Sequence, residues 1–210
     1  AAEAVLAVKS VLVDLNDDAA TLPNNYNSVE NITPLETPLS STVNGAALAT
    51  PVFLSLYAEN DLRLDKYFAE ADEKGFRKNK KAGSNNYLCT FRVGEIYLTA
   101  AEAAAQLGQL PQARTRLLEL MRKRYAPEAY EAKSIAVNAM DKEALVQEIL
   151  DERARELAFE GHRWFDLRRS TRPRLEKVLG GTRYVLEEDD ARYTLSIPKE
   201  AIEANPGLLN

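Results

Sequence analysis

Residues 151–169 read DERARELAFEGHRWFDLRR, and this stretch decides the fold. It carries five arginines, three glutamates and two aspartates, together with the only tryptophan and the only histidine of the chain. Bulky apolar side chains stand between these charges. A solvated helix would not need them, and a buried helix tolerates the charges only when they are paired. The stretch predicts a helix, a sharp turn at Gly161 and a second short helix, with ions that pair with one another at the junction.

Three carboxylates of this stretch lie four residues apart and so project from one helix face. Such a row could perform acid–base chemistry or bind a metal, but a Glu-x-x-His metal motif would need Glu where Phe159 stands. Arg153, Arg155 and Arg163 lie within reach, which favours structural ion pairing, with His162 as a turn residue. Trp164 could stack on a sugar ring, but a core position is favoured. The predicted structural cluster comprises Glu152, Arg153, Glu156, Glu160, Arg163, Trp164, Asp166 and Arg168.

The composition limits the class of protein. The 210 residues suffice for one sizeable domain or two small ones. The net charge of −5 argues against a nucleic-acid partner. The single cysteine, Cys89, excludes an internal disulfide and a cysteine-based zinc cluster. No apolar run reaches the roughly 18 residues of a membrane helix, and residues 1–13 do not resemble a signal peptide. The chain has no Gly-rich phosphate loop and no nucleophile elbow, so neither a cofactor nor a catalytic residue is expected.

The first half of the chain alternates between helical and irregular patterns. Apolar spacings of three and four predict a helix over residues 2–15. Residues 16–51, rich in Asn, Asp, Ser, Thr and Pro, predict a long loop. Two short helices are predicted within 52–69, followed by a loop or hairpin over 70–86. Residues 87–91 predict a brief extended run.

The second half is more strongly helical. An alanine-rich helix is predicted over residues 92–107, and Gly108 ends it. Pro111 suits the first turn of the next helix, which runs to about Arg124. Two such helices form an antiparallel hairpin of the tetratricopeptide type. Residues 125–140 are expected to be an irregular connection.

The remaining elements are shorter. Asp141 is expected to cap a helix that runs from Lys142 to about Glu160. A second helix is predicted over 162–170, followed by a polar tail that contains Gly180-Gly181. A short strand is predicted over 192–198 and one helical turn over 199–202. Taken together, the fold class is mainly α, with tetratricopeptide-like hairpins, long loops and a few short strands.

Residues suited to ligand binding lie in the loops. Aromatic rings offer apolar contact to a sugar, and neighbouring amide or charged groups meet its hydroxyls. Three tyrosines have such neighbours, although each could also be an ordinary turn residue. The predicted ligand-binding residues are Tyr26, Tyr57, Asn60, Asp61, Arg63, Asn86 and Tyr87.

The order of these signals resembles the C-terminal part of the SusD/RagB family of starch-utilisation-type outer-membrane lipoproteins. The resemblance rests on FRVGEIYLTAAEA at 91–103, ILDER at 149–153 and ELAFEGHRWFDLRR at 156–169. It is extended by NDLRL at 60–64 and by the terminal Ile197-Pro198, Ile202, Asn205-Pro206 and Asn210. Together these pieces span roughly residues 52–210.

This resemblance implies a function in nutrient capture. Members of the family bind glycans or other nutrients at the outer face of the outer membrane, and they are not enzymes. They pass the ligand to a TonB-dependent SusC-type transporter, over which they act as a lid. Tetratricopeptide-like helix pairs support their loop-rich ligand surface.

Two departures from the family pattern shape the expected organisation. Family members are usually much longer, and their N-terminal repeat region and lipidated N-terminal cysteine are absent from this sequence. We therefore expect a single C-terminal SusD-like domain over 1–210, with membrane attachment only through a lipid anchor that the sequence does not contain. The alternative is a helical-repeat protein–protein interaction module without a small ligand. An enzyme that uses the face of Glu152, Glu156 and Glu160 ranks last.

Overall fold

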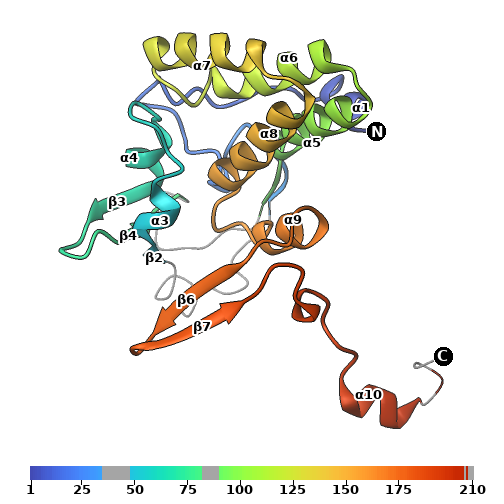
Figure 1. Cartoon of the computed structure of the whole chain (residues 1–210). Helices are drawn as coiled ribbons and strands as arrows, with labels where there is room; N and C mark the ends of the chain where they lie inside the picture. The colour runs from blue at the N-terminus through green and yellow to red at the C-terminus, as the bar shows by residue number, and fades with distance from the viewer. Residues whose placement is uncertain (35–47, 82–89, 206, 208–210) are drawn as a thin grey trace. The chain divides into compact units, whose positions relative to one another are not determined.

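The computed structural model describes residues 1–34, 48–81, 90–205 and 207. The described chain is mainly helical, as predicted, and Figure 1 shows its helices with a few short strands. It divides into two compact units, Ala1–His162 and Arg163–Asn210. The first unit contains α1 (Ala2–Leu6), β1 (Asn31–Pro34), β2 (Leu48–Ala49), α3 (Pro51–Leu54), α4 (Arg63–Tyr67), β3 (Phe68–Ala71), β4 (Arg77–Asn79), β5 (Thr90–Arg92), α5 (Val93–Gln106), α6 (Leu110–Met121), α7 (Pro127–Ala139) and α8 (Lys142–Glu156).

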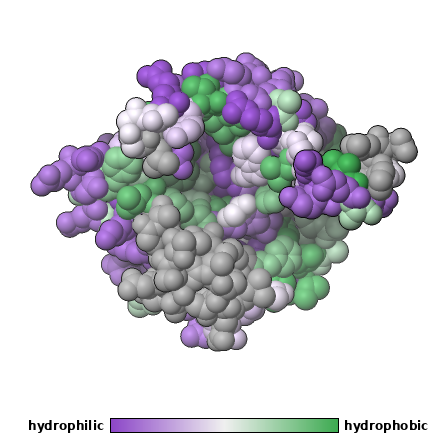
Figure 2. All heavy atoms as spheres, turned by 90° about the horizontal axis from the view of Figure 1, so that it is seen from below, coloured by the Kyte–Doolittle hydropathy of each residue, from purple (hydrophilic) through white to green (hydrophobic). Residues whose placement is uncertain are grey.

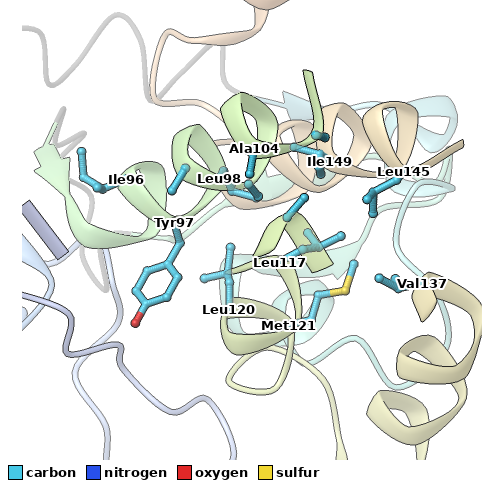
Figure 3. Packing of buried hydrophobic residues seen from close by; sticks show 14 of the residues in the cluster. Ile96, Tyr97, Leu98, Ala104, Leu117, Leu120, Met121, Val137, Leu145 and Ile149 are labelled. Carbon is cyan, nitrogen blue, oxygen red and sulfur yellow. The ribbon is translucent and has the colours of Figure 1, made fainter. Parts of the chain in front are cut away.

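The helices α5 and α6 form the predicted antiparallel hairpin. The chain reverses at Gly108, whose φ of +77° is a left-handed conformation that favours glycine. Pro111 lies in the first turn of α6, where its missing N–H leaves no helical hydrogen bond unmade. Figure 3 shows the core that this hairpin forms with α8: Leu98, Leu117 and Ile149 are fully buried in one apolar cluster.

Residues 127–139 form the helix α7, so the prediction of an irregular connection over 125–140 was wrong. Val137 is the one residue of α7 that is buried, and the helix therefore lacks the broad apolar stripe that marks a helix in sequence. Its local signal is Pro127, which occupies the first helical position. The helix packs against α6, as the next helix would in a tetratricopeptide-like array.

The helix α8 begins at the predicted cap and ends earlier than predicted. The Asp141 side chain accepts a hydrogen bond from the Ala144 backbone N–H at 2.9 Å. The helix ends at Glu156 instead of near residue 160, because Phe159 has a left-handed φ of 62°. Gly161, with a φ of +86°, then makes the predicted turn.

The N-terminal segment is less helical than predicted. The helix expected over 2–15 ends at Leu6. Residues 16–34 of the predicted long loop fold into successive turns and end in β1, which pairs antiparallel with β5. Residues 35–47 lie outside the described residues. The hairpin expected within 70–86 is present as β3 and β4, and β2 joins them in a sheet of order β2-β4-β3.

The second unit contains α9 (Arg163–Arg169), β6 (Leu175–Leu179), β7 (Thr182–Leu186), the 3₁₀ helix η1 (Ala191–Tyr193) and α10 (Lys199–Ala204). The expected polar tail is in fact the antiparallel hairpin β6–β7, with its turn at Gly180-Gly181. The strand predicted over 192–198 is wrong, because its first residues belong to η1 and the rest are irregular. Trp164 stacks on the buried Tyr193 ring, with 5.2 Å between the ring centroids.

Candidate binding surface and the ionic cluster beneath it

Glu156 is the centre of a buried ionic cluster in the first unit. One carboxylate oxygen accepts hydrogen bonds from Arg92 Nη1 at 2.6 Å and Arg124 Nη2 at 2.9 Å. The other accepts from Arg124 Nε at 2.9 Å and Arg63 Nη1 at 3.2 Å. These four side chains are wholly inaccessible to solvent. Three guanidinium groups therefore converge on one carboxylate away from water.

The other two carboxylates of the row lie on either side of this centre. Glu152 accepts from Arg63 Nη1 at 2.6 Å and from Arg155 Nε at 2.9 Å. Glu160 accepts from Arg92 Nε at 3.0 Å and also from the Lys81 ammonium group. Helix spacing places Glu152 and Glu156 on one face of α8, and Glu160 joins them from the turn that follows the helix.

Two further carboxylates from outside this row complete the cluster. Glu30 bridges Arg124 at 2.6 Å and Arg92 at 3.0 Å, and Asp61 pairs with Arg63 at 2.8 Å. Among the described residues, five buried cations thus meet five buried carboxylates, and Arg155 also pairs with the half-buried Glu148 at 2.6 Å. The cations are Arg63, Lys81, Arg92, Arg124 and Arg155, and the carboxylates are Glu30, Asp61, Glu152, Glu156 and Glu160.

The carboxylates of the row are ionised at neutral pH. Burial raises the pKa of Glu156, but Arg124 and Arg92 outweigh it and hold that pKa well below its ordinary value. The same balance lowers the pKa of Glu152 beside Arg63. It also lowers the pKa of Glu160 beside Arg92. A carboxylate held in its charged form by several arginines is a poor proton donor, which suits a structural cluster better than acid–base chemistry.

The sources of the cations differ from the prediction. Of the arginines expected to pair with the row, Arg155 does so, but Arg153 lies within 3.5 Å of the Thr99 hydroxyl. Arg163 is exposed in the second unit. The main cations come instead from α4, β4–β5 and the end of α6, so the cluster joins several elements and is not a self-paired junction of two helices. Four members of the cluster were not predicted from the sequence: Glu30, Lys81, Arg92 and Arg124. Only Arg92 carried a local signal, because it is a charged residue between the apolar residues Phe91 and Val93.

The rest of the predicted structural set lies in the second unit. Asp166 is buried and pairs with Arg169 at 2.7 Å. Arg168 is half-buried, and its carbonyl accepts a hydrogen bond from Arg172 at 3.0 Å. Trp164 is half-buried against Tyr193.

Three of the predicted ligand-binding residues are interior. Asp61 and Arg63 belong to the ionic cluster, and Tyr57, 6% exposed, donates its hydroxyl hydrogen to the Arg155 carbonyl at 2.8 Å. The contacts of these three side chains within the described residues are structural, and their burial leaves little surface for a ligand. Asn60 and Tyr26 are exposed, the latter by 44%. The last two, Asn86 and Tyr87, lie outside the described residues.

The ionic cluster holds the chain segment that passes over it, residues 12–16. Arg124 Nη1 donates to the Val13 carbonyl at 2.6 Å, and the Val13 N–H donates to Glu30 at 2.9 Å. The next contact is a backbone hydrogen bond from Leu15 to the Lys123 carbonyl at 2.9 Å. Both backbone groups of one residue are therefore fixed by buried charges.

This fixed segment forms the wall between two surface pockets. The smaller, of ≈ 250 Å³, is lined by Leu12, Val13, Asp14, Ala20, Thr21, Asn27 and Val29. The larger, of ≈ 530 Å³, is lined by Asp14, Asn16, Arg122, Lys123, Tyr125, Pro127, Tyr130 and Glu131. Asp14 lines both. We call the two together the segment 12–16 surface.

The segment 12–16 surface is polar with an aromatic component. Asp14 forms an ion pair with Lys123 at 2.8 Å, and the half-buried ring of Tyr130 lies in the same pocket. Within the described chain, the side chains of Arg122, Glu131 and Tyr130 form no hydrogen bond or ion pair with another residue. These groups are available to a ligand.

The same described ranges contain neither a metal site nor a membrane-spanning helix. No group of three or more His, Cys, Asp or Glu side chains there could hold a metal ion. Nor does that part of the chain contain a helix with the length and apolarity needed to cross a bilayer. Among the atoms coloured in Figure 2, polar and apolar residues are interspersed on the face shown.

Comparison with known proteins gives a consistent result. The model of the SusD family matches residues 46–210. A solved SusD-like carbohydrate binding protein from Bacteroides vulgatus is 18% identical, with a TM-score of 0.64 over 98% of this chain and 53% of its own. A SusD superfamily protein from Bacteroides fragilis is 24% identical, with a TM-score of 0.54 over 73% of this chain and 34% of its own. The chain thus spans about half the length of the first of these structures. No curated protein matches it.

Proposed function

Because the chain belongs to the SusD family, we propose that it is the glycan- or nutrient-binding component of an outer-membrane uptake system. In this role it captures an oligo- or polysaccharide outside the cell and delivers it to a TonB-dependent SusC-type transporter. It performs no chemistry on the ligand. Attachment to the outer face of the outer membrane through a lipid anchor is part of the same proposal.

The observation that carries the proposal is the family match over most of the chain. The buried ionic cluster supports it, because charges that are fully paired and dry are not available for catalysis. The segment 12–16 surface supports it as well, since a tyrosine ring beside unpaired polar groups is the lining that a sugar requires. Tyr26 and Asn60 remain proposed contacts at the exposed surface.

The test is calorimetric titration of the full-length protein with a broad panel of oligo- and polysaccharides. We expect at least one glycan to bind. Absence of binding to every glycan of the panel, together with tight binding of a protein partner, would overturn glycan binding in favour of a helical interaction module. Co-purification with a SusC-type transporter from detergent-solubilised outer membranes tests the partnership independently of the ligand.

A further inference from the structure

The two pockets of the segment 12–16 surface share one wall, and this arrangement bears on the ligand's length. Asp14 lines both pockets, so the two pockets adjoin at this residue. The larger pocket, of ≈ 530 Å³, lies within the roughly 300–1,000 Å³ typical of small-molecule sites, and the smaller, of ≈ 250 Å³, lies slightly below it. A single compact ligand would fill one pocket, and a chain of linked units would fill both.

The charges of the larger pocket cancel. Its lining contains two basic residues, Arg122 and Lys123, and two acidic residues, Asp14 and Glu131. The ion pair between Lys123 and Asp14 neutralises the shared wall. A strongly anionic ligand would meet two carboxylates there, and a cationic ligand would meet two basic groups. The lining therefore favours a ligand without net charge.

The unpaired groups provide both donors and acceptors. Arg122 can only donate, Glu131 can only accept, and the Tyr130 hydroxyl can do both. In the smaller pocket the exposed Thr21 and Asn27 side chains add a hydroxyl and an amide. A lining that contains both donors and acceptors matches the hydroxyl groups of a sugar, and the Tyr130 ring offers it an apolar face.

The wall is also preorganised. Arg124 and Glu30 hold both backbone groups of Val13, and the Asn16 side chain donates to Asp14 at 2.9 Å and to the Tyr125 carbonyl at 3.3 Å. A wall fixed before binding does not have to be ordered by the ligand, which lowers the cost of binding.

We infer that the segment 12–16 surface is a site of at least two subsites for a neutral oligosaccharide, with Asp14 between the subsites. This inference rests on the proposed function and assigns its ligand class and its location. The larger pocket takes one sugar unit against Tyr130, and the smaller pocket takes a neighbouring unit beside Thr21 and Asn27.

The test uses calorimetry on the full-length protein with neutral oligosaccharides of increasing length and with uronic-acid oligosaccharides of equal length. Affinity is expected to rise between one and two sugar units and to change little between low and high salt. Glu131→Ala and Tyr130→Ala are each expected to weaken binding about tenfold. The matched control is Glu128→Ala, because Glu128 is an exposed carboxylate of the same helix that lines neither pocket. Thr21→Val should weaken binding only of ligands with two or more units.

The outcomes separate the inference from the proposed function. If a neutral glycan binds but Glu131→Ala and Thr21→Val match the Glu128→Ala control, the location is wrong while the protein remains a glycan binder. A preference for uronic-acid ligands that fades in high salt would overturn the neutral class. Absence of binding to every glycan would overturn the proposed function and this inference together. Tyr130 also packs against the core, so the Tyr130→Ala variant could fail to fold. In that case the Glu131→Ala variant, whose side chain is exposed, provides the test of the location.

Discussion

Arg124 joins the buried carboxylate of Glu156 to the surface of the molecule. Its Nε and Nη2 atoms pair with Glu156 at 2.9 Å each, and its Nη1 atom donates to a backbone carbonyl of the segment that separates the two pockets, at 2.6 Å. The Arg124 side chain therefore connects the buried ionic cluster directly to the backbone of the proposed site. The cluster acts as the support of the binding surface.

Removing the central charge should destabilise the protein strongly. Glu156→Gln leaves Arg63, Arg92 and Arg124 buried around a neutral amide, and breaking a buried ion pair costs about 3–5 kcal/mol. We expect a loss of about 3 kcal/mol or more in the free energy of unfolding, measured by chemical denaturation. The control Glu128→Gln, on the exposed surface of α7, should stay within about 0.5 kcal/mol. Equal stability of the two variants would show that the cluster does not hold the fold together.

The cluster should also make the free energy of unfolding fall steeply at acid pH. Glu152, Glu156 and Glu160 have pKa values lowered from the ordinary 4.5, so the unfolded chain binds more protons than the folded chain in acid. Their contribution is complete above pH 4.5 and is lost as the pH falls through the lowered values. Chemical denaturation at successive pH values should show this loss. In the Glu152→Gln variant, the free energy of unfolding should fall less steeply as the pH decreases. An unfolding free energy that stays constant below pH 4.5 would contradict the assignment.

Gly94 should resist a substitution that ordinarily stabilises helices. A Cβ atom there would lie 2.5 Å from Arg92 Nη1 and 3.1 Å from Glu156 Oε1. The Arg92 guanidinium cannot move aside without breaking its bonds to Glu30, Glu156 and Glu160. Helix propensity alone predicts that Gly94→Ala adds about 1 kcal/mol, whereas we expect a loss of about 2 kcal/mol from overpacking. Thermal and chemical denaturation decide the sign, and a stabilised variant would refute the close packing.

The only tryptophan reports on the second unit. Trp164 stacks on Tyr193 with an angle of 10° between the rings. Tyr193→Leu should expose the indole and shift its fluorescence emission to longer wavelength, while a substitution at the exposed Tyr184 should not. An unchanged spectrum for the Tyr193 variant would mean that the stacked pair does not form in solution.

The sequence was most informative where one local signal determines the structure. The break at Gly108, the proline at 111 and the cap at Asp141 each act within a few residues, and the α5–α6 hairpin and the start of α8 followed from them. The helix α7 was missed because a helix that buries only Val137 has no apolar periodicity. The β6–β7 hairpin was missed because its strands, LEKVL and TRYVL, show no strict alternation of apolar and polar residues.

The ionic cluster shows where sequence reasoning stops. The spacing of Glu152, Glu156 and Glu160 is visible in the sequence, and so is their need for partners. The identity of the partners is not, because Arg124 reaches Glu156, and Glu30 reaches Arg124, through tertiary packing across long separations in the chain. For the same reason Asp61 and Arg63 resembled a loop site in sequence, although both are buried.

Hydrogen–deuterium exchange of the full-length protein, with and without a saturating glycan found by the titrations, tests the central claim most directly. The claim is that ligand binds over residues 12–16 while the ionic cluster only supports that segment. We predict slower exchange on binding for residues 12–16 and 122–131, with no change in 152–160. Protection confined to 152–160, with residues 12–16 unaffected, would contradict the claim and place the ligand at the charged row itself.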